Sequence, residues 1–246
     1  RPTIDYSAEA REGMKQAGSL AGLLIESMLS CAGQVPLPPS YFPEVASAVR
    51  NQGGMLIADE VQVGFGRVGT HMWAFQESGV IPDIVVMGKP IGNGHPMAAV
   101  FTTPEIASSF GGMEFFSTFG GNPVSCAIGM AVMEVIEKED LMNRAHVLGE
   151  RFKNGLNSLM QEHELIGDVR GRGLFLGVEI VKDRSTLEPA AMEASEIVGA
   201  MRDQGVLLST DGPLHNVIKI KPPMVLNHDD IDRTLSKLEN CLSVME

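Results

Sequence analysis

The sequence lacks the features of a membrane-spanning or secreted protein. None of its apolar runs approaches the ~20 residues needed to cross a bilayer. Its start, Arg1 to Tyr6, has neither a basic-then-apolar signal nor an initiating methionine, so we expect an internal or trimmed segment. The few cysteines, Cys31, Cys126 and Cys241, are widely spaced in apolar surroundings. Free buried thiols in a reducing cytoplasm are therefore expected instead of disulfides.

Positive charge is also scarce. Lysine and arginine number 19 against 31 aspartate and glutamate residues, which gives a formal net charge of −12. This balance argues against binding to nucleic acid or to an anionic membrane surface. His71, His95 and His146 do not have metal-ligand spacing, so no metal is expected. No glycine run has the spacing of a dinucleotide-binding fingerprint, and no internal repeat is visible.

The first part of the chain alternates short apolar runs with amphipathic stretches. At 246 residues and 44% hydrophobic content, the chain can bury a sizeable core. The pattern predicts helices at 6–18, 41–51 and 71–78, and strands at 21–25, 55–58, 84–87 and 97–102. Such alternation indicates an α/β fold with a mostly parallel sheet and crossover helices. Residues 124–136 are apolar nearly all round and predict a buried helix.

The pattern changes after a long amphipathic helix predicted at 140–163. The residues that follow predict strands at 165–170, 174–181, 206–208 and 217–220, and helices at 190–204 and 229–244. This order indicates a small α+β domain. We therefore expect one domain over residues 1–138 and a second, with the connecting helix, over residues 139–246.

Asp59 and Lys89 each follow a short apolar run that predicts a buried parallel strand. The carboxyl ends of neighbouring parallel strands meet at the crevice where open α/β sheets bind ligands. A lysine there can form an imine with an aldehyde cofactor, and a carboxylate can keep a pyridine nitrogen protonated. The ordinary alternatives are a solvated surface lysine and an aspartate that caps the following turn. The pair is thus a candidate site for pyridoxal 5′-phosphate (PLP).

Four stretches in order resemble the class III PLP-dependent aminotransferases: Ala58–Arg67 (ADEVQVGFGR), Pro82–Lys89 (PDIVVMGK), Ser117–Pro123 (STFGGNP) and Val169–Leu174 (VRGRGL). The resemblance implies fold type I, the aspartate aminotransferase-like fold, with a PLP-binding large domain and a small C-terminal domain. Members are typically longer, with a Gly/Ser-rich phosphate-binding turn and an aromatic residue that stacks on the cofactor. Neither is found here, so the chain resembles the C-terminal part of such an enzyme.

The resemblance also implies roles for single residues. Lys89 would form the aldimine with PLP and then move protons at the substrate, while Asp59 would bind the pyridine nitrogen. Val61 would press on the ring face, and Gln62 would bind the phenolic oxygen. Thr118 would reach the phosphate of the neighbouring subunit's PLP, which implies a homodimer with shared sites. The alternative for Thr118 is a place in the N-terminal turn of the following helix.

Two further residues of the first motif are left with structural interpretations. A structural salt bridge is as plausible for Glu60 as a catalytic role. Arg67, among Gly64, Gly66 and Gly69, is interpreted as structural and not as a substrate ligand.

Lys219 bears on the substrate. Many members of the family carry an arginine just before a Pro-Pro pair, where it grips the substrate's α-carboxylate; here Lys219 stands in Val217–Met224 (VIKIKPPM). Lysine lacks the planar fork of arginine but is a competent phosphate binder. Leu208–Pro213 and Gly92–Pro96 resemble a subgroup that includes alanine–glyoxylate aminotransferase 2-like enzymes and phospho-lyases acting on phosphoethanolamine or phosphohydroxylysine.

Three functions follow from these features. The preferred hypothesis is an aminotransferase that moves an amino group from an amine or amino acid to a 2-oxo acid. The second is a phospho-lyase that eliminates phosphate from an O-phosphorylated amine. The third is a non-catalytic fragment without the N-terminal cofactor motif.

Overall fold

The computed structural model describes residues 4–112 and 114–245. The chain forms two compact units. The first comprises the residues up to Ser27, Leu37–Phe65 and Trp73–Glu139, and the second comprises Met28–Pro36, Gly66–Met72 and the residues from Asp140 onward. Two short loops of the N-terminal half therefore pack with the C-terminal unit. No helix within the described residues is long and apolar enough to span a bilayer.

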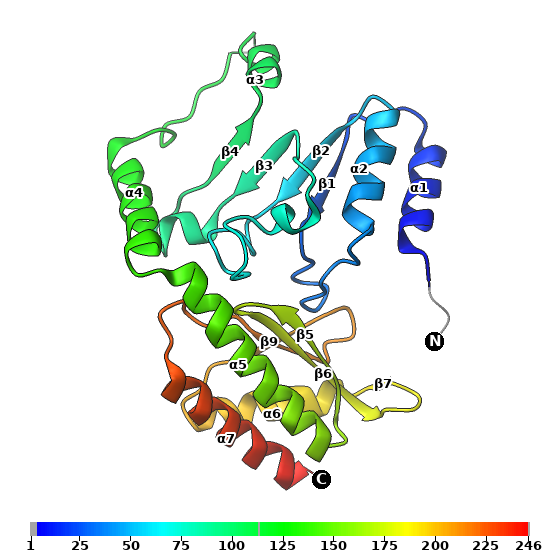
Figure 1. The fold of residues 1–246 in the computed structure, drawn as a ribbon, viewed down its shortest axis with the longest axis vertical. Coiled ribbons are helices and arrows are strands. Elements are labelled where there is room, and N and C mark those ends of the chain that lie inside the picture. Colours follow the sequence, from blue (N-terminus) through cyan, green and yellow to red (C-terminus); the bar gives the residue numbers. More distant parts are fainter. Residues whose placement is uncertain (1–3, 113, 246) are drawn as a thin grey trace. The chain divides into compact units, whose positions relative to one another are not determined.

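A four-stranded sheet forms the centre of the first unit (Figure 1). Its order is β1 (Gly22–Glu26), β2 (Met55–Asp59), β3 (Ile84–Met87) and β4 (Ala99–Thr102). The first three strands are parallel and β4 is antiparallel to β3, which confirms the expected mostly parallel sheet.

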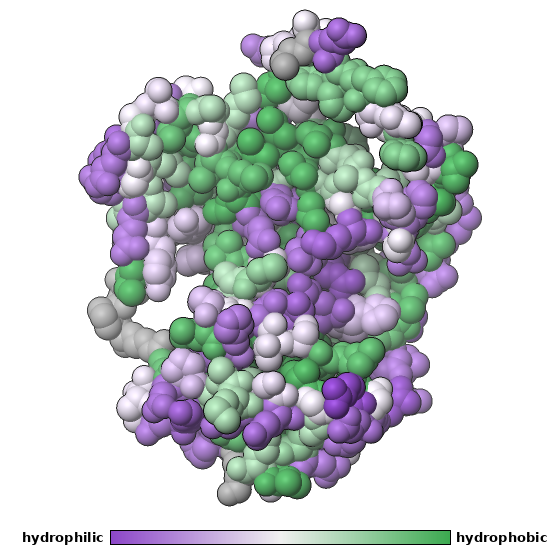
Figure 2. Space-filling view, turned by 180° about the vertical axis from the view of Figure 1, so that it is seen from behind, coloured by the Kyte–Doolittle hydropathy of each residue, from purple (hydrophilic) through white to green (hydrophobic). Residues whose placement is uncertain are grey.

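Helices α1 (Tyr6–Ala17) and α2 (Tyr41–Asn51) cover one face of this sheet with apolar side chains. Leu56 and Ala58 of β2 are fully buried in that core. Because side chains alternate along a strand, Leu24 and Met55 belong to the other face, where they are 63% and 38% exposed. Figure 2 shows hydrophobic residues gathered at the surface of this unit. One face of the sheet is thus covered and the other is not.

Helix α4 (Pro123–Lys138) differs from the sequence expectation. It completes the first unit together with η1 (Ala74–Ser78), η2 (Lys89–Gly92) and α3 (Pro104–Phe110). A buried helix was predicted, but Val124 and Met130 are 64% and 59% exposed, and Gly129 is its one fully buried residue among those described. The helix packs only along the stripe at Gly129, where η2 and Met97 approach closely. The prediction of a buried helix was wrong, because apolar residues are buried only where another part of the chain packs on them, and most of α4 has no such neighbour among the described residues.

The second unit has the predicted α+β architecture. Its sheet runs β5 (Ile166–Arg172), β6 (Phe175–Asp183), β9 (Val217–Ile220) and β8 (Ser209–Asp211), and β7 (Glu188–Pro189) pairs with the end of β6. Helices α5 (Leu141–Glu162), α6 (Ala191–Asp203) and α7 (His228–Met245) contribute to its core. Alternate residues such as Val178 and Ile218 point into this core. Gly177, Lys219 and their neighbours of the same alternation therefore occupy the opposite face.

Three local predictions need correction. The predicted strand at 206–208 is absent: the amide of Val206 donates to the carbonyl of Met201 at the end of α6, and pairing begins only at Ser209. The helix predicted at 71–78 is confined to the 3-10 turn η1. Of the cysteines expected to be buried, only Cys241 is; Cys31 and Cys126 are exposed.

Candidate active site

The carboxyl ends of β2 and β3 bring Asp59 and Lys89 to the same edge of the sheet. Asp59 lies opposite Val86 in the parallel register, and the amide of Glu60 extends the pairing by donating to the Val86 carbonyl at 2.9 Å. Lys89 follows two residues after Met87, the last residue of β3. The structure therefore places both residues where the sequence predicted them, at the ligand-binding edge of an open α/β sheet.

Lys89 has an unusual backbone. Its φ is +35°, a left-handed conformation that costs a non-glycine residue on the order of 1–3 kcal/mol. Pro90 follows directly and, with its φ fixed by the ring, starts the tight turn η2. The side chain is exposed among the described residues. Strain of this kind persists at functional sites because it aims a side chain.

Asp59 is half-buried and uses one carboxylate oxygen to organise its own loop. Oδ1 accepts a hydrogen bond of 2.9 Å from the amide of Val61, which is the turn-capping role considered as the alternative. Within the described residues, Oδ2 makes no hydrogen bond. The capping and cofactor roles are therefore compatible, since one oxygen holds the turn and the other can accept from a ring N–H.

Val61 lies beside the residue that precedes Lys89. A Cβ built on Gly88 would be 3.6 Å from Val61 Cγ1, an ordinary contact distance. The apolar side chain of Val61 therefore lies next to Gly88, the residue before Lys89. Gln62 follows on the same loop and is half-buried. The structure places Asp59, Val61 and Lys89 at the carboxyl ends of neighbouring strands, and their roles toward a cofactor stay predictions.

Thr118 is less closely tied to this group. It is exposed, on the segment before α4, and no hydrogen bond joins it to Asp59 or Lys89 in the described part of the chain. The helix N-terminus is capped by Asn122, whose Oδ1 accepts from the amide of Ser125 at 2.9 Å. Thr118 lies four residues before this cap and so outside the first turn of α4, and its phosphate contact stays a prediction.

Sequence reasoning missed a polar link between the lysine loop and α4. His95, in the loop after η2, lies with its Nε2 2.7 Å from the Ser125 hydroxyl, which also accepts from the Asn122 amide group at 2.9 Å. His95 and Ser125 are 30 positions apart. No local pattern marks such a pair.

Glu60 is a completely buried carboxylate. It accepts hydrogen bonds from the amides of Ala74 and Phe75, at 2.8 and 2.9 Å, and so caps the first turn of η1. The salt-bridge interpretation was wrong, because the partners found among the described residues are backbone donors. Burial raises the pKa of Glu60 above its ordinary value of 4.5.

The pKa of Glu60 predicts a pH-dependent effect of Glu60→Gln. A raised folded-state pKa means that the carboxyl contributes stability at low pH, and that this contribution is lost as pH rises through the folded-state pKa. Glutamine does not titrate. The difference in Tm, variant minus wild type, should therefore increase between pH 4.5 and pH 8, by about 2–4 °C for each kcal/mol of stability that the carboxyl loses. Thermal unfolding at both pH values measures it, with the exposed Glu12→Gln as control; an unchanged difference would contradict the burial argument.

Arg67 belongs to the second unit and is structural, as predicted. Its Nη1 donates to the carbonyls of Leu174 and Pro222, at 3.0 and 2.9 Å. Burial lowers the pKa of Arg67 to about 10, so the group is still charged at neutral pH. It fixes the chain just after β9.

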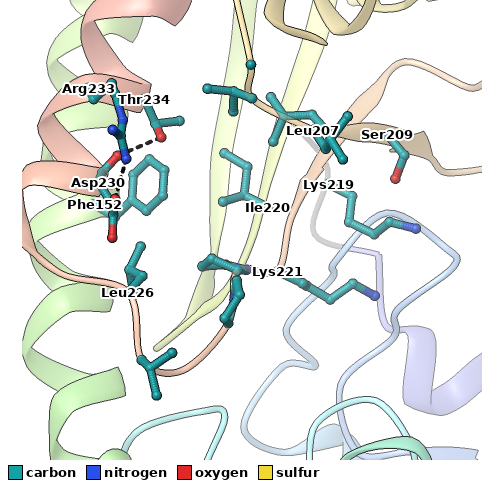
Figure 3. A pocket seen from close by; sticks show the side chains of 16 residues that line it. Phe152, Leu207, Ser209, Lys219, Ile220, Lys221, Leu226, Asp230, Arg233 and Thr234 are labelled. Carbon is teal, nitrogen blue, oxygen red and sulfur yellow. Dashed lines mark hydrogen bonds and ion pairs between the residues drawn. The ribbon is translucent and has the colours of Figure 1, made fainter. Parts of the chain in front are cut away.

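Lys219 and Lys221 extend from the same side of β9, while Ile220 between them points the other way (Figure 3). Both lysines line a hollow of about 660 Å³ in the second unit. Lys221 Nζ lies 5.1 Å from the centre of the Phe175 ring, a cation–π contact. Burial, together with the neighbouring Lys219 ammonium, lowers the pKa of Lys221 to about 8. The chain therefore holds the positive charges of Lys219 and Lys221 close to each other although they repel.

Lys219 is not an isolated cation. Its Nζ donates to Asp211 Oδ1 at 3.1 Å, and Asp211 Oδ2 accepts from Gln34 Nε2 at 2.8 Å. Sequence reasoning singled out Lys219 as a substrate ligand but missed both partners. Gln34 is 177 positions from Asp211, so only the fold brings them together.

The residues at the ends of β2 and β3 fit the reactive end and the ring of PLP. Lys89 presents an exposed amine on a strained backbone, Asp59 has a carboxylate oxygen directed to no described partner, and Val61 is an apolar side chain beside Gly88. These are the groups that an aldehyde, a pyridine nitrogen and a ring face require.

Comparisons with known proteins agree with this fit. The sequence model of the family Aminotransferase class-III matches residues 4–242. A Drosophila melanogaster alanine–glyoxylate aminotransferase 2-like protein is 53% identical over 92% of this chain and 46% of its own length. The Caenorhabditis elegans ethanolamine-phosphate phospho-lyase homolog 1 is 47% identical over 94% of this chain and 50% of its own length.

A solved structure gives the same result. A phospholyase from Arthrobacter in complex with phosphoethanolamine superposes with a TM-score of 0.92 at 41% identity, over 96% of this chain and 57% of that one. The chain thus spans about half the length of the curated relatives named above. Class III aminotransferases use PLP as their cofactor and adopt fold type I. The match over residues 4–242 shows that this chain belongs to the class III aminotransferase family.

Proposed function

We propose that this chain serves a PLP-dependent lyase that eliminates phosphate from an O-phosphorylated amine. The observation that carries the proposal is the pair of neighbouring lysines, Lys219 in β9 and Lys221 just after it, since Lys219 stands where the family resemblance implies a carboxylate-binding arginine. A phosphate monoester carries a charge of about −1.5 to −2 at pH 7, whereas a carboxylate carries −1. Two compact ammonium groups suit the former better than the latter.

The relatives support the same choice. Two of the similar proteins named above are phospho-lyases, and one of these was solved with phosphoethanolamine. From sequence alone, transamination was preferred; the ammonium groups of Lys219 and Lys221, which extend to the same side of the chain (Figure 3), shift the preference to elimination.

Each residue then has a defined task. Lys89 would hold the cofactor covalently through its Nζ, and its amine, once free, would take the proton from the substrate carbon next to nitrogen. Asp59 would keep the ring nitrogen protonated through its second oxygen, while its first oxygen holds the loop of Val61. Bound PLP supplies an electron sink for the carbon that loses the proton. Lys219 and Lys221 would bind the phosphate that leaves the neighbouring carbon, so no 2-oxo acid is consumed.

A second candidate is transamination, favoured by the 53% identity to the aminotransferase 2-like protein. It requires the same lysine and the same aspartate. The two reactions differ in what is consumed, because transamination needs a 2-oxo acid as amino acceptor and elimination does not.

Phosphate release therefore tests the proposal directly. The PLP-loaded protein should release inorganic phosphate from phosphoethanolamine with no 2-oxo acid present. Turnover that requires pyruvate or glyoxylate and releases no phosphate would establish transamination instead. The control reaction contains the protein without PLP.

Replacing Lys219 with alanine should weaken substrate binding and leave the cofactor in place. The loss of one charge-assisted contact, worth about 1.5–3 kcal/mol, should raise the KM for phosphoethanolamine roughly 10- to 100-fold. Covalently bound PLP, measured by visible absorption, should be unchanged. Lys182→Ala, which removes an exposed lysine paired with Glu188 in the same unit, is the matched control. Loss of bound PLP in Lys219→Ala would show that this residue had been misassigned.

We further propose that the protein acts as a homodimer. Large apolar side chains of α4 and the preceding segment are exposed: Phe115 72%, Phe116 85%, Phe119 83%, Val124 64% and Met130 59%. Exposed apolar surface of this extent is typical of an interface. The family resemblance of Thr118, on the same segment, favours a second copy as the partner. Sedimentation equilibrium of the PLP-loaded protein checks it; a monomer at micromolar concentration would contradict it.

A further inference from the structure

Lys219 is the end of a three-residue polar chain on the outer face of the small sheet. Asp211 lies diagonally across from Lys219 on the neighbouring strand β8, because Asp211 pairs with Val217 and Ser209 with Lys219. Its two carboxylate oxygens are divided between the Lys219 ammonium, at 3.1 Å, and the Gln34 amide group, at 2.8 Å. The carboxylate is 14% exposed and the lysine side chain 27% exposed, so the ion pair is partly shielded from water.

Gln34 is itself firmly held. It is fully buried, has a left-handed φ of +53°, and donates a second hydrogen bond from Nε2 to the Ser30 carbonyl at 2.9 Å. Its loop is closed by paired hydrogen bonds between Leu29 and Val35, at 3.0 and 2.8 Å. The left-handed backbone of a buried glutamine costs on the order of 1–3 kcal/mol of stability. Its amide group is aimed at Asp211.

The same loop is attached to the sheet at two further points. Arg170 Nε donates to the Gly33 carbonyl at 2.8 Å, and the amide of Gly212, next to Asp211, donates to the Cys31 carbonyl at 3.0 Å. A Cβ on Gly177 would come within 3.0 Å of Gln34 Cβ, so the loop lies directly on β6. The loop that carries Gln34, the hydrogen-bond partner of Asp211, is therefore held against the sheet.

We propose that Asp211 is the positioning residue of the anion site: it holds the Lys219 ammonium in one place through an ion pair that Gln34 anchors. This inference rests on the proposed role of Lys219 in binding the substrate's phosphate. A lysine has a flexible four-carbon stem, and an anchored ion pair removes that freedom before substrate arrives. The carboxylate also offsets part of the positive charge, so the site binds phosphate without retaining it as product.

Two effects follow and they have opposite signs. Removing the negative charge should strengthen the binding of inorganic phosphate, because a nearby repulsion disappears. Removing the ion pair should slow turnover, because Lys219 is no longer aligned with the leaving group. A residue that merely supported the fold would lower Tm and leave phosphate binding unchanged.

Asp211→Asn tests this in the PLP-loaded protein. Asparagine keeps the size of the side chain and one acceptor oxygen but not the charge. The inhibition constant of inorganic phosphate should fall about five- to tenfold, and kcat for phosphoethanolamine should fall roughly tenfold. Asp211→Glu retains the charge and should keep the phosphate constant within about twofold of wild type. Glu188→Gln, which removes a carboxylate from an exposed ion pair of the same unit, should alter neither value.

The outcomes separate this inference from the proposed function. An unchanged or larger phosphate inhibition constant in Asp211→Asn, together with weaker phosphate binding in Lys219→Ala, would overturn the role of Asp211 alone. Phosphate binding that is unchanged in Lys219→Ala would overturn the anion site itself, and the role of Asp211 with it. Circular dichroism of each variant shows that the fold is retained.

Discussion

Replacing Lys89 with alanine is expected to abolish turnover. Its amine is the covalent attachment point in the proposed mechanism and also the base at the substrate carbon, so a single substitution removes two functions. Losses for a residue with both roles reach about 10⁴-fold or more in kcat. The left-handed φ of +35° is as unfavourable for alanine as for lysine, so this backbone strain is the same in the wild type and in Lys89→Ala.

Steady-state kinetics and the visible absorption of bound PLP measure the effect together. Lys89→Ala should lose both activity and covalent cofactor. Lys15→Ala, which removes an exposed lysine of α1 in the same unit, is the matched control and should keep both. Measurable turnover in Lys89→Ala would overturn the assignment of the catalytic lysine.

Replacing Asp59 with asparagine should lower kcat by about two to four orders of magnitude while PLP stays bound. The loop is expected to survive, because asparagine Oδ1 can still accept the hydrogen bond from the Val61 amide. What disappears is the negative charge that keeps the ring nitrogen protonated. The cost should therefore fall on rate much more than on binding.

The comparison that isolates this effect is Asp83→Asn. Asp83 belongs to the same sheet but lies at its other edge, immediately before β3. There its carboxylate accepts a hydrogen bond from the Leu56 amide at 2.8 Å and forms an ion pair with Arg50 at 3.1 Å. Its loss should lower Tm and leave kcat nearly unchanged. If Asp59→Asn instead lowered Tm with little change in kcat, its carboxylate would be a turn cap and nothing more.

The ends of β2 and β3 could be predicted from the sequence because everything that positions them is local. A short apolar run forms a buried strand, and the polar residue that follows must emerge at the strand's carboxyl end. Asp59 and Lys89 lie within such continuous motifs, so the fold places them at the carboxyl ends of neighbouring strands as the sequence indicates.

Features that depend on distant partners could not be predicted in the same way. The apolar residues of α4 indicated a buried helix, yet only the stripe at Gly129 finds a partner within the described chain. The polar chain from Gln34 to Asp211 joins residues 177 positions apart, and the contact between His95 and Ser125 crosses 30. None of these residues is unusual in its local sequence.

The most direct test of the central claim is to mix the protein with PLP, reduce it with borohydride and map the labelled peptide by mass spectrometry. Reduction makes a covalent imine permanent, so the label records which amine holds the cofactor. The account predicts a visible absorption band before reduction and a label on Lys89 alone. No band, or a label scattered over surface lysines, would contradict the claim that the ends of β2 and β3 form a cofactor site.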